Sequence, residues 1–180
     1  MLDFCNWIKK KQESIQEAAA PVLPDPKSVD IMYIAAILTR KSQKKLWDYV
    51  RDKVEIPADW KKYCHHMTIR FMPKDDKVLP ILGLEVTLVV TDIYADDKGV
   101  AVRVEPNTNS QELHMPPEQL PHVTIAVAPG VQPVYSNELL RRSESMKIPQ
   151  AFLLDAFTGA KLKRGPIVPE REDMAVESFT

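Results

Sequence analysis

The stretch "YCHHMTIRF" at residues 63–71 contains the sequence His-Met-Thr-Ile, and "PHVTIAV" at residues 121–127 contains His-Val-Thr-Ile. The chain of 180 residues has 4 histidines, so this motif uses half of them. Each motif lies in a segment that alternates polar and apolar residues, as a β-strand with one buried face does. The two segments therefore predict two strands that present the same short polar motif.

Alternation along a strand places residues i and i+2 on one face. His66 and Thr68 therefore share a face with Arg70, and His122 and Thr124 share a face on the second strand. The opposite faces are apolar, with Met67, Ile69 and Phe71 on the first strand and Val123, Ile125 and Val127 on the second. We expect the apolar faces to form a core and the polar faces to line a cleft.

The neighbouring histidine, His65, is expected to point away from His66 because adjacent side chains on a strand lie on opposite faces. His66 is therefore the functional candidate, and His65 is expected to be structural. The same alternation argues against a metal site at Cys64, His65 and His66, since no second spaced pair of ligands accompanies them. We expect neither a metal nor an organic cofactor.

Two imidazoles and two hydroxyls on one cleft suit phosphodiester chemistry. A neutral imidazole can take a proton from the attacking water or ribose hydroxyl, and an imidazolium can give one to the leaving oxygen. Threonine hydroxyls can bind the non-bridging phosphate oxygens. This predicts His66 and His122 as the acid and base, and Thr68 and Thr124 as phosphate-binding residues.

The rest of the chain predicts an α+β fold. Residues 31–39 form an apolar run typical of a buried strand, and a helix with Ser42 as N-cap is expected over 42–54. The remaining predicted elements are a hairpin over 84–94 and 99–105, a helix over 136–147 with Ser136 or Asn137 as N-cap, and a closing hairpin over 151–165.

The paired motifs "HMTI" and "HVTI" resemble the signature of the two-histidine phosphoesterase superfamily, which has the pattern His-x-Thr/Ser-x with apolar x. This superfamily includes LigT-like RNA phosphodiesterases, tRNA-ligase cyclic phosphodiesterase domains and phage anti-CBASS nucleases. The resemblance implies a two-lobed α+β fold, in which antiparallel sheets flank a central cleft and helices lie outside. It also implies metal-independent catalysis by His66 and His122, with Thr68 and Thr124 on the phosphate.

The resemblance covers residues 29–165 and defines the expected phosphodiesterase domain. Residues 1–28 are expected to form an N-terminal helix and a proline-rich connector, and residues 166–180 a polar tail. The N-terminal helix is a candidate contact for a partner protein. No apolar run reaches the length of a membrane span, and two isolated cysteines give no disulfide framework, so we expect a cytoplasmic location, in the host if the protein is viral.

A net charge of −1 argues against a protein that coats nucleic acid through a basic surface. The favoured hypothesis is an enzyme that cleaves a cyclic oligonucleotide messenger, a 2′–5′ linkage or a 2′,3′-cyclic phosphate, such as a phage or viral enzyme that degrades host immune nucleotides. The alternatives are cellular processing of RNA ends and a non-catalytic module that binds nucleotides or RNA ends. Tyr33, Arg70 and Tyr135 are additional candidates for substrate contacts.

Overall fold

The computed structural model describes residues 31–73, 81–107, 113, 115–164, 167–168 and 173–174. The predicted N-terminal helix, the connector, His114 and most of the predicted tail lie outside the described residues. The described strands are β1 (Ile31–Leu38), β2 (Lys61–Lys62), β3 (His66–Phe71), β4 (Glu85–Ala95), β5 (Gly99–Pro106), β6 (His122–Val127), β7 (Met146–Leu162) and β8 (Ile167–Val168). The described helices are α2 (Arg40–Lys53), the short 3₁₀ helix η2 (Pro133–Tyr135) and α3 (Ser136–Arg142).

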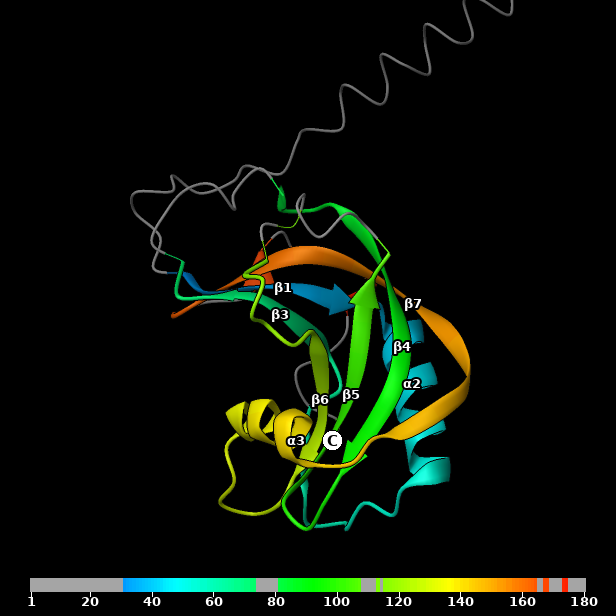
Figure 1. Cartoon of the computed structure of the whole chain (residues 1–180). Coiled ribbons are helices and arrows are strands. Elements are labelled where there is room, and N and C mark those ends of the chain that lie inside the picture. The colour runs from blue at the N-terminus through cyan, green and yellow to red at the C-terminus, as the bar shows by residue number, and fades with distance from the viewer. Residues whose placement is uncertain are drawn as a thin grey trace, which may run out of the picture.

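These strands form one antiparallel sheet in the order β1-β3-β6-β5-β4-β7-β8, and β1 also pairs with β7. The sheet therefore closes into a barrel, with β7 as the closing strand (Figure 1). At the closure, Ala156 and Phe157 pair with β4 on one side and with β1 on the other. A closed sheet leaves fewer unpaired edges than an open one.

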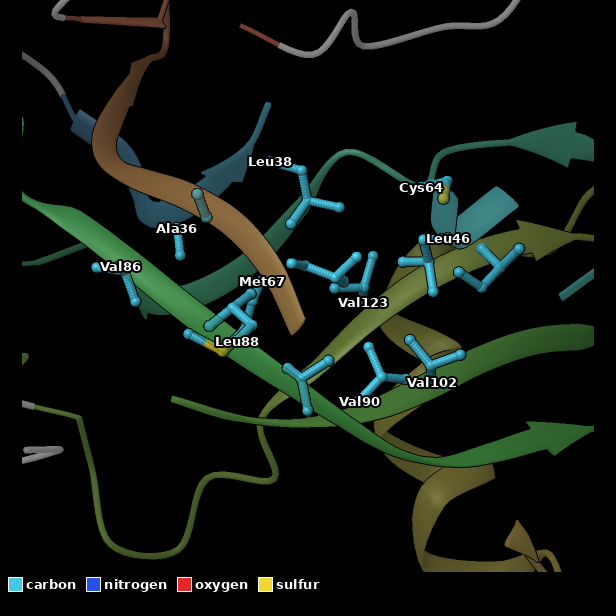
Figure 2. Close-up of a cluster of buried hydrophobic side chains, with 14 of the residues drawn as sticks. Ala36, Leu38, Leu46, Cys64, Met67, Val86, Leu88, Val90, Val102 and Val123 are labelled. Carbon is cyan, nitrogen blue, oxygen red and sulfur yellow. The ribbon is translucent and has the colours of Figure 1, made fainter. Parts of the chain in front are cut away.

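The main core fills the space that the barrel encloses. Its members come from all six barrel strands and from α2, and several point toward one another in Figure 2: Ala36, Leu38, Leu46, Met67, Leu88, Val90, Val102 and Val123. The alternation predicted for β3 and β6 is confirmed for Met67, Ile69, Val123 and Ile125, which are all fully buried. The expectation that Phe71 joins this core face is wrong, because Phe71 lies beyond a register shift and is 67% exposed. The polar faces of β3 and β6 therefore lie on the outside of the barrel.

Helix α2 begins at Arg40, two residues before the predicted start. Thr39 is its N-cap, since the Thr39 side chain accepts a hydrogen bond from the backbone N–H of Ser42. The prediction of Ser42 as the cap is wrong. Ser42 is buried instead, and its hydroxyl accepts a hydrogen bond of 2.7 Å from the backbone N–H of Asp155 on β7.

The hairpin of β4 and β5 is confirmed, with Asp96 accepting hydrogen bonds from the backbone of Lys98 and Gly99 in the turn. The C-terminal prediction is partly wrong. The helix α3 ends at Arg142, and β7 continues without a turn to Leu162, through most of the range predicted as a hairpin. Gly159, within that range, pairs with Ala35 inside the sheet. The long strand is favoured because it has a partner on both sides, which local sequence cannot indicate.

The fold is thus α+β, a predominantly antiparallel barrel with two α-helices among the described residues. The strand topology shows a single sheet and does not distinguish the two lobes that the resemblance implied. None of the described helices is long and apolar enough to cross a membrane.

Two adjacent leucines on β7 test this assignment of inside and outside. Leu154 is fully buried in the core, whereas Leu153 is 52% exposed. We expect Leu154→Ala to lower the free energy of unfolding by about 2–5 kcal/mol, because it leaves a cavity. The matched control Leu153→Ala is expected to change it by about 0.5 kcal/mol or less. Urea denaturation measures both, and equal losses would contradict the barrel assignment.

Candidate active site on the outer face of the barrel

The two His-x-Thr motifs lie on neighbouring strands. β3 pairs with β6 in antiparallel register at Met67 and Val123. In such a pair, the flanking residues face one another across the strands, so His66 lies opposite Thr124 and Thr68 lies opposite His122. All four motif side chains are half-buried on the outer face, while the residues between them are in the core. The structure therefore brings together the four residues that the sequence singled out.

The ring of His66 is held between two other rings. Tyr33 on β1 stacks on it with ring centroids 4.8 Å apart and an interplanar angle of 12°. His65 stacks at 4.5 Å, and the Nδ1 atoms of the two histidines are 2.5 Å apart. One of these nitrogens carries the proton that the other accepts. The contacts with Tyr33 and with His65 restrict the His66 ring, and they place Tyr33, one of the candidate substrate contacts, beside His66.

The expectation that His65 points away from His66 is wrong. β2 pairs with β6 through Lys62 and Ala126, whereas β3 pairs through Met67 and Val123. The chain between these pairs has four residues (63–66) where β6 has two (124–125), so it bulges out of the sheet. Cys64 takes the left-handed conformation with φ of 55°, and the strand alternation begins only at His66. His65, 5% exposed, therefore lies beside His66.

His122 is oriented by the chain just before its own strand. Its Nδ1 lies 2.7 Å from the backbone carbonyl oxygen of Leu120. A carbonyl can only accept, so Nδ1 carries the proton and donates it. The neutral ring is therefore the Nδ1–H tautomer, with Nε2 free to accept a proton.

The environment lowers the pKa of both motif histidines. Burial lowers the pKa of His66 well below its usual value, and the charges that His65 and His122 can carry lower it further. Burial also lowers the pKa of His122, against the opposing effect of the hydrogen bond to Leu120. Both rings are consequently neutral at pH 7 in the free protein. The register of β3 and β6 places the two imidazoles diagonally across this strand pair.

Thr124 has a partner that the sequence did not suggest. Its hydroxyl oxygen is 2.9 Å from that of Ser136, the first residue of α3, which is 1% exposed. The prediction of Ser136 or Asn137 as a helix cap is wrong, because the helix begins at Ser136 and its N-cap is Tyr135, which makes no side-chain cap. Helix α3 packs on the same outer face, with Leu139 against Ala101 of β5.

Tyr135 and Arg70, two candidates for substrate contacts, differ from Tyr33 in placement. The Tyr135 hydroxyl donates a 2.5 Å hydrogen bond to Asp96, which raises the pKa of Tyr135 to about 12. Its ring packs against Gly99, so Tyr135 attaches α3 to the β4–β5 turn. Arg70 pairs across a register shift with Ile34, a core residue, and this shift interrupts the alternation expected to place Arg70 beside Thr68.

Sequence analysis missed Arg103 on β5. Arg103 is the cross-strand partner of His122 and lies on the same outer face, and it is half-buried. Its Nε atom is buried and has no hydrogen-bond acceptor among the described residues. The signal was present in the alternation of "VAVRVE" at residues 100–105, but only the strand order shows that β5 lies beside β6.

Cys64, the first residue of the metal cluster considered above, faces the core. It is fully buried, its thiol lies 3.7 Å from the backbone oxygen of Gln43, and burial raises its pKa. A search of the described part of the chain finds no group of three or more His, Cys, Asp or Glu residues placed to hold a metal ion. The residues that meet at the site are thus imidazoles, hydroxyls and a guanidinium, which suit an anion.

Comparison with known proteins identifies the family. The sequence model of the fungal tRNA ligase phosphodiesterase domain matches residues 37–153, more than half of the chain, and this range contains both His-x-Thr motifs. The chain therefore belongs to the fungal tRNA ligase phosphodiesterase domain family, a group of two-histidine phosphoesterase-type domains, and the recognition from the motifs is confirmed.

A solved structure shares the fold. The crystal structure of a fungal RNA kinase superposes with a TM-score of 0.55 and 13% sequence identity, over 85% of this chain and 52% of that chain. The protein thus spans about half the length of that structure. A search of the curated proteins finds no match.

The first prediction for this site concerns the histidine titrations. With 4 histidines in the chain, NMR of ring-labelled protein can follow each one. We expect His66 and His122 to titrate below pH 6.5, His66 furthest. His65→Ala removes one neighbouring charge and should move the His66 pKa upward. A His66 pKa unchanged by His65→Ala, in a folded variant, would contradict the coupling between the adjacent rings.

The second prediction concerns stability at acidic pH. The unfolded chain protonates histidine near pH 6.5, whereas folded His66 protonates only at much lower pH. The unfolded state therefore binds more protons below pH 6.5, and stability is lost as the pH falls toward the folded pKa. We expect His66→Gln to lose less unfolding free energy than wild type between pH 7 and pH 5, measured by urea denaturation. Parallel losses in the two proteins would argue against a buried, neutral His66.

Proposed function

We propose that this protein hydrolyses 2′,3′-cyclic phosphates at RNA ends, with His66 and His122 as acid and base. The observation that carries the proposal is the register of β3 and β6, which sets each histidine opposite the threonine of the other motif. A phosphate between the strands would meet an imidazole from each motif and a hydroxyl from each motif. Membership of a tRNA ligase phosphodiesterase family supports RNA as the substrate class.

The proposed reaction adds one water across a bond of the cyclic phosphate. One neutral imidazole takes a proton from water as its oxygen bonds to phosphorus. The other imidazole, protonated, gives its proton to the ribose oxygen as that P–O bond breaks, and a phosphate monoester remains. His122 has the appropriate tautomer for either task, because Leu120 holds the proton on Nδ1 and Nε2 is left for transfer.

The low pKa of the free rings fits this cycle. A neutral ring is ready to act as a base, and the negative charge of a bound phosphodiester raises the pKa of a neighbouring imidazole. When the substrate binds, one imidazole would therefore take up a proton from solvent and could then act as the acid. Thr124, positioned by Ser136, and Thr68 are proposed to bind the non-bridging oxygens, where their hydroxyls can donate hydrogen bonds.

RNA ends are preferred here over the cyclic oligonucleotide messengers favoured by the sequence alone. The matching family is named for a fungal tRNA ligase, and the superposing structure is a fungal RNA kinase. Neither comparison supports a phage or viral enzyme that degrades immune nucleotides. Cytoplasmic location and independence from metal ions remain part of the proposal.

The test is an RNA oligonucleotide that ends in a 2′,3′-cyclic phosphate, incubated in excess chelator and analysed by mass spectrometry. We expect a product heavier by one water, and about 10²-fold or greater loss of turnover in His66→Ala and His122→Ala. Arg141→Ala, an exposed change on α3, is the matched control and should retain activity.

Three results would contradict this proposal. Cleavage of cyclic dinucleotides but not of the RNA end would favour the messenger hypothesis. Tight binding of the RNA end without any product would indicate a binding module. A strict requirement for an added divalent ion would overturn acid–base catalysis by the two histidines alone.

A further inference from the structure

Arg103 occupies a position that the proposed reaction does not use. The pairings across the outer face place Thr68, His122, Arg103, Asp92 and Lys147 side by side on β3, β6, β5, β4 and β7, and we call this set the polar row. Arg103 is thus next to His122 on the side away from Thr68. Neighbouring strands lie about 4.8 Å apart, so its side chain begins about one strand spacing beyond His122 and about two beyond Thr68.

The nearest carboxylate in the polar row does not neutralise Arg103. Asp92 is paired instead with Lys147, with Nζ and Oδ1 2.6 Å apart. Burial raises the pKa of Asp92, but hydrogen bonds from Lys147, Thr91 and Ser145 outweigh this effect and lower it. Asp92 thus has a cation partner other than Arg103. Apart from this ion pair, its buried Oδ1, like the Nε of Arg103 across the strand pair, makes no hydrogen bond among the described residues.

The guanidinium of Arg103 also lacks an acceptor within the described protein at its buried Nε atom. Buried donors in folded proteins are nearly always satisfied, so one left open beside a proposed catalytic histidine calls for a ligand that brings an acceptor. The planar fork of arginine matches phosphate oxygens in particular. In the proposed reaction the scissile phosphate lies between His66 on β3 and His122 on β6, whereas Arg103 lies on β5, on the other side of His122.

We propose that Arg103 binds a second phosphate of the substrate, the 5′-phosphate of the nucleoside whose 2′,3′-cyclic phosphate is opened. This inference rests on the proposed function and extends it to specificity. The terminal nucleoside of an RNA carries both groups, whereas a free nucleoside 2′,3′-cyclic phosphate carries only one. Arg103 therefore selects RNA ends and 5′-phosphorylated nucleotides over the simple cyclic nucleotide.

The experiment compares adenosine 2′,3′-cyclic phosphate with its 5′-phosphorylated form. We expect the wild-type protein to prefer the 5′-phosphorylated substrate by about 10- to 100-fold in kcat/KM, as expected for a hydrogen bond between charged groups. Arg103→Ala should remove most of this preference by raising KM, with kcat little changed, because the remote phosphate is held equally before and during reaction. Arg103→Lys, which keeps the charge but not the fork, should retain part of it.

Arg51→Ala is the matched control, since Arg51 is an exposed arginine of α2 that pairs with Asp48. It should leave the preference unchanged. Equal losses of kcat/KM on both substrates in Arg103→Ala would overturn the inference. They would mean that Arg103 either contacts the scissile phosphate or only stabilises the fold. No preference in the wild-type protein would overturn it as well.

A binding measurement separates this inference from the proposed function. Calorimetric titration of both nucleotides into His66→Ala and into His66→Ala/Arg103→Ala proteins needs no turnover. Tighter binding of the 5′-phosphorylated form that is lost with Arg103 supports the second phosphate site, even if the wild-type protein cleaves neither compound. Equal affinities in the first protein, or no binding of either compound, would overturn it.

Discussion

The pairing of β3 with β6 at Met67 and Val123 is the constraint on which the site depends. These two residues point into the core, and their burial holds the register. A slip of one residue would turn every side chain of one strand to the opposite face, exposing Ile69 or Ile125 and burying the polar motif residues. Burial of Met67 and Val123 therefore does two things: it stabilises the barrel, and it aligns the two motifs. A substitution at Met67 or Val123 would act on the site through register as well as on stability.

The same packing explains why the histidines are neutral. The motif strands lie in the middle of the sheet, between β1 on one side and β5 on the other, and α3 packs on the face beside them. The rings are consequently shielded from water, and shielding disfavours the charged imidazole. His65 and His122 add to this at His66, since three imidazoles that share one site do not readily carry positive charge together. A bound anion would favour the protonated form of these imidazoles and so offset the effects of burial and of the neighbouring rings.

How well the sequence predicts the site depends on how local each signal is. Alternation within a strand correctly placed His66 with Thr68 and His122 with Thr124, because each pair lies inside one regular element. It was wrong for His65, where Cys64 has a positive φ and the chain bulges, and for Arg70, which follows a register shift. Irregularities of this kind arise from pairing with distant strands, so no local pattern indicates them. The buried run of β1 and the β4–β5 hairpin were predictable, whereas β7 was not.

Arg103 and Ser136 are two site residues that local sequence patterns did not indicate. Both lie in elements that the sequence predicted, and both are next to a motif residue only because of the strand order and the packing of α3. The side chains of the polar row change in character from one strand to the next. It begins at Thr68, crosses His122 and becomes charged at Arg103, while α3 covers Ala101 in the adjacent row of β5. A nucleotide with its cyclic phosphate between the histidines and its 5′-phosphate at Arg103 would follow this row across the strands.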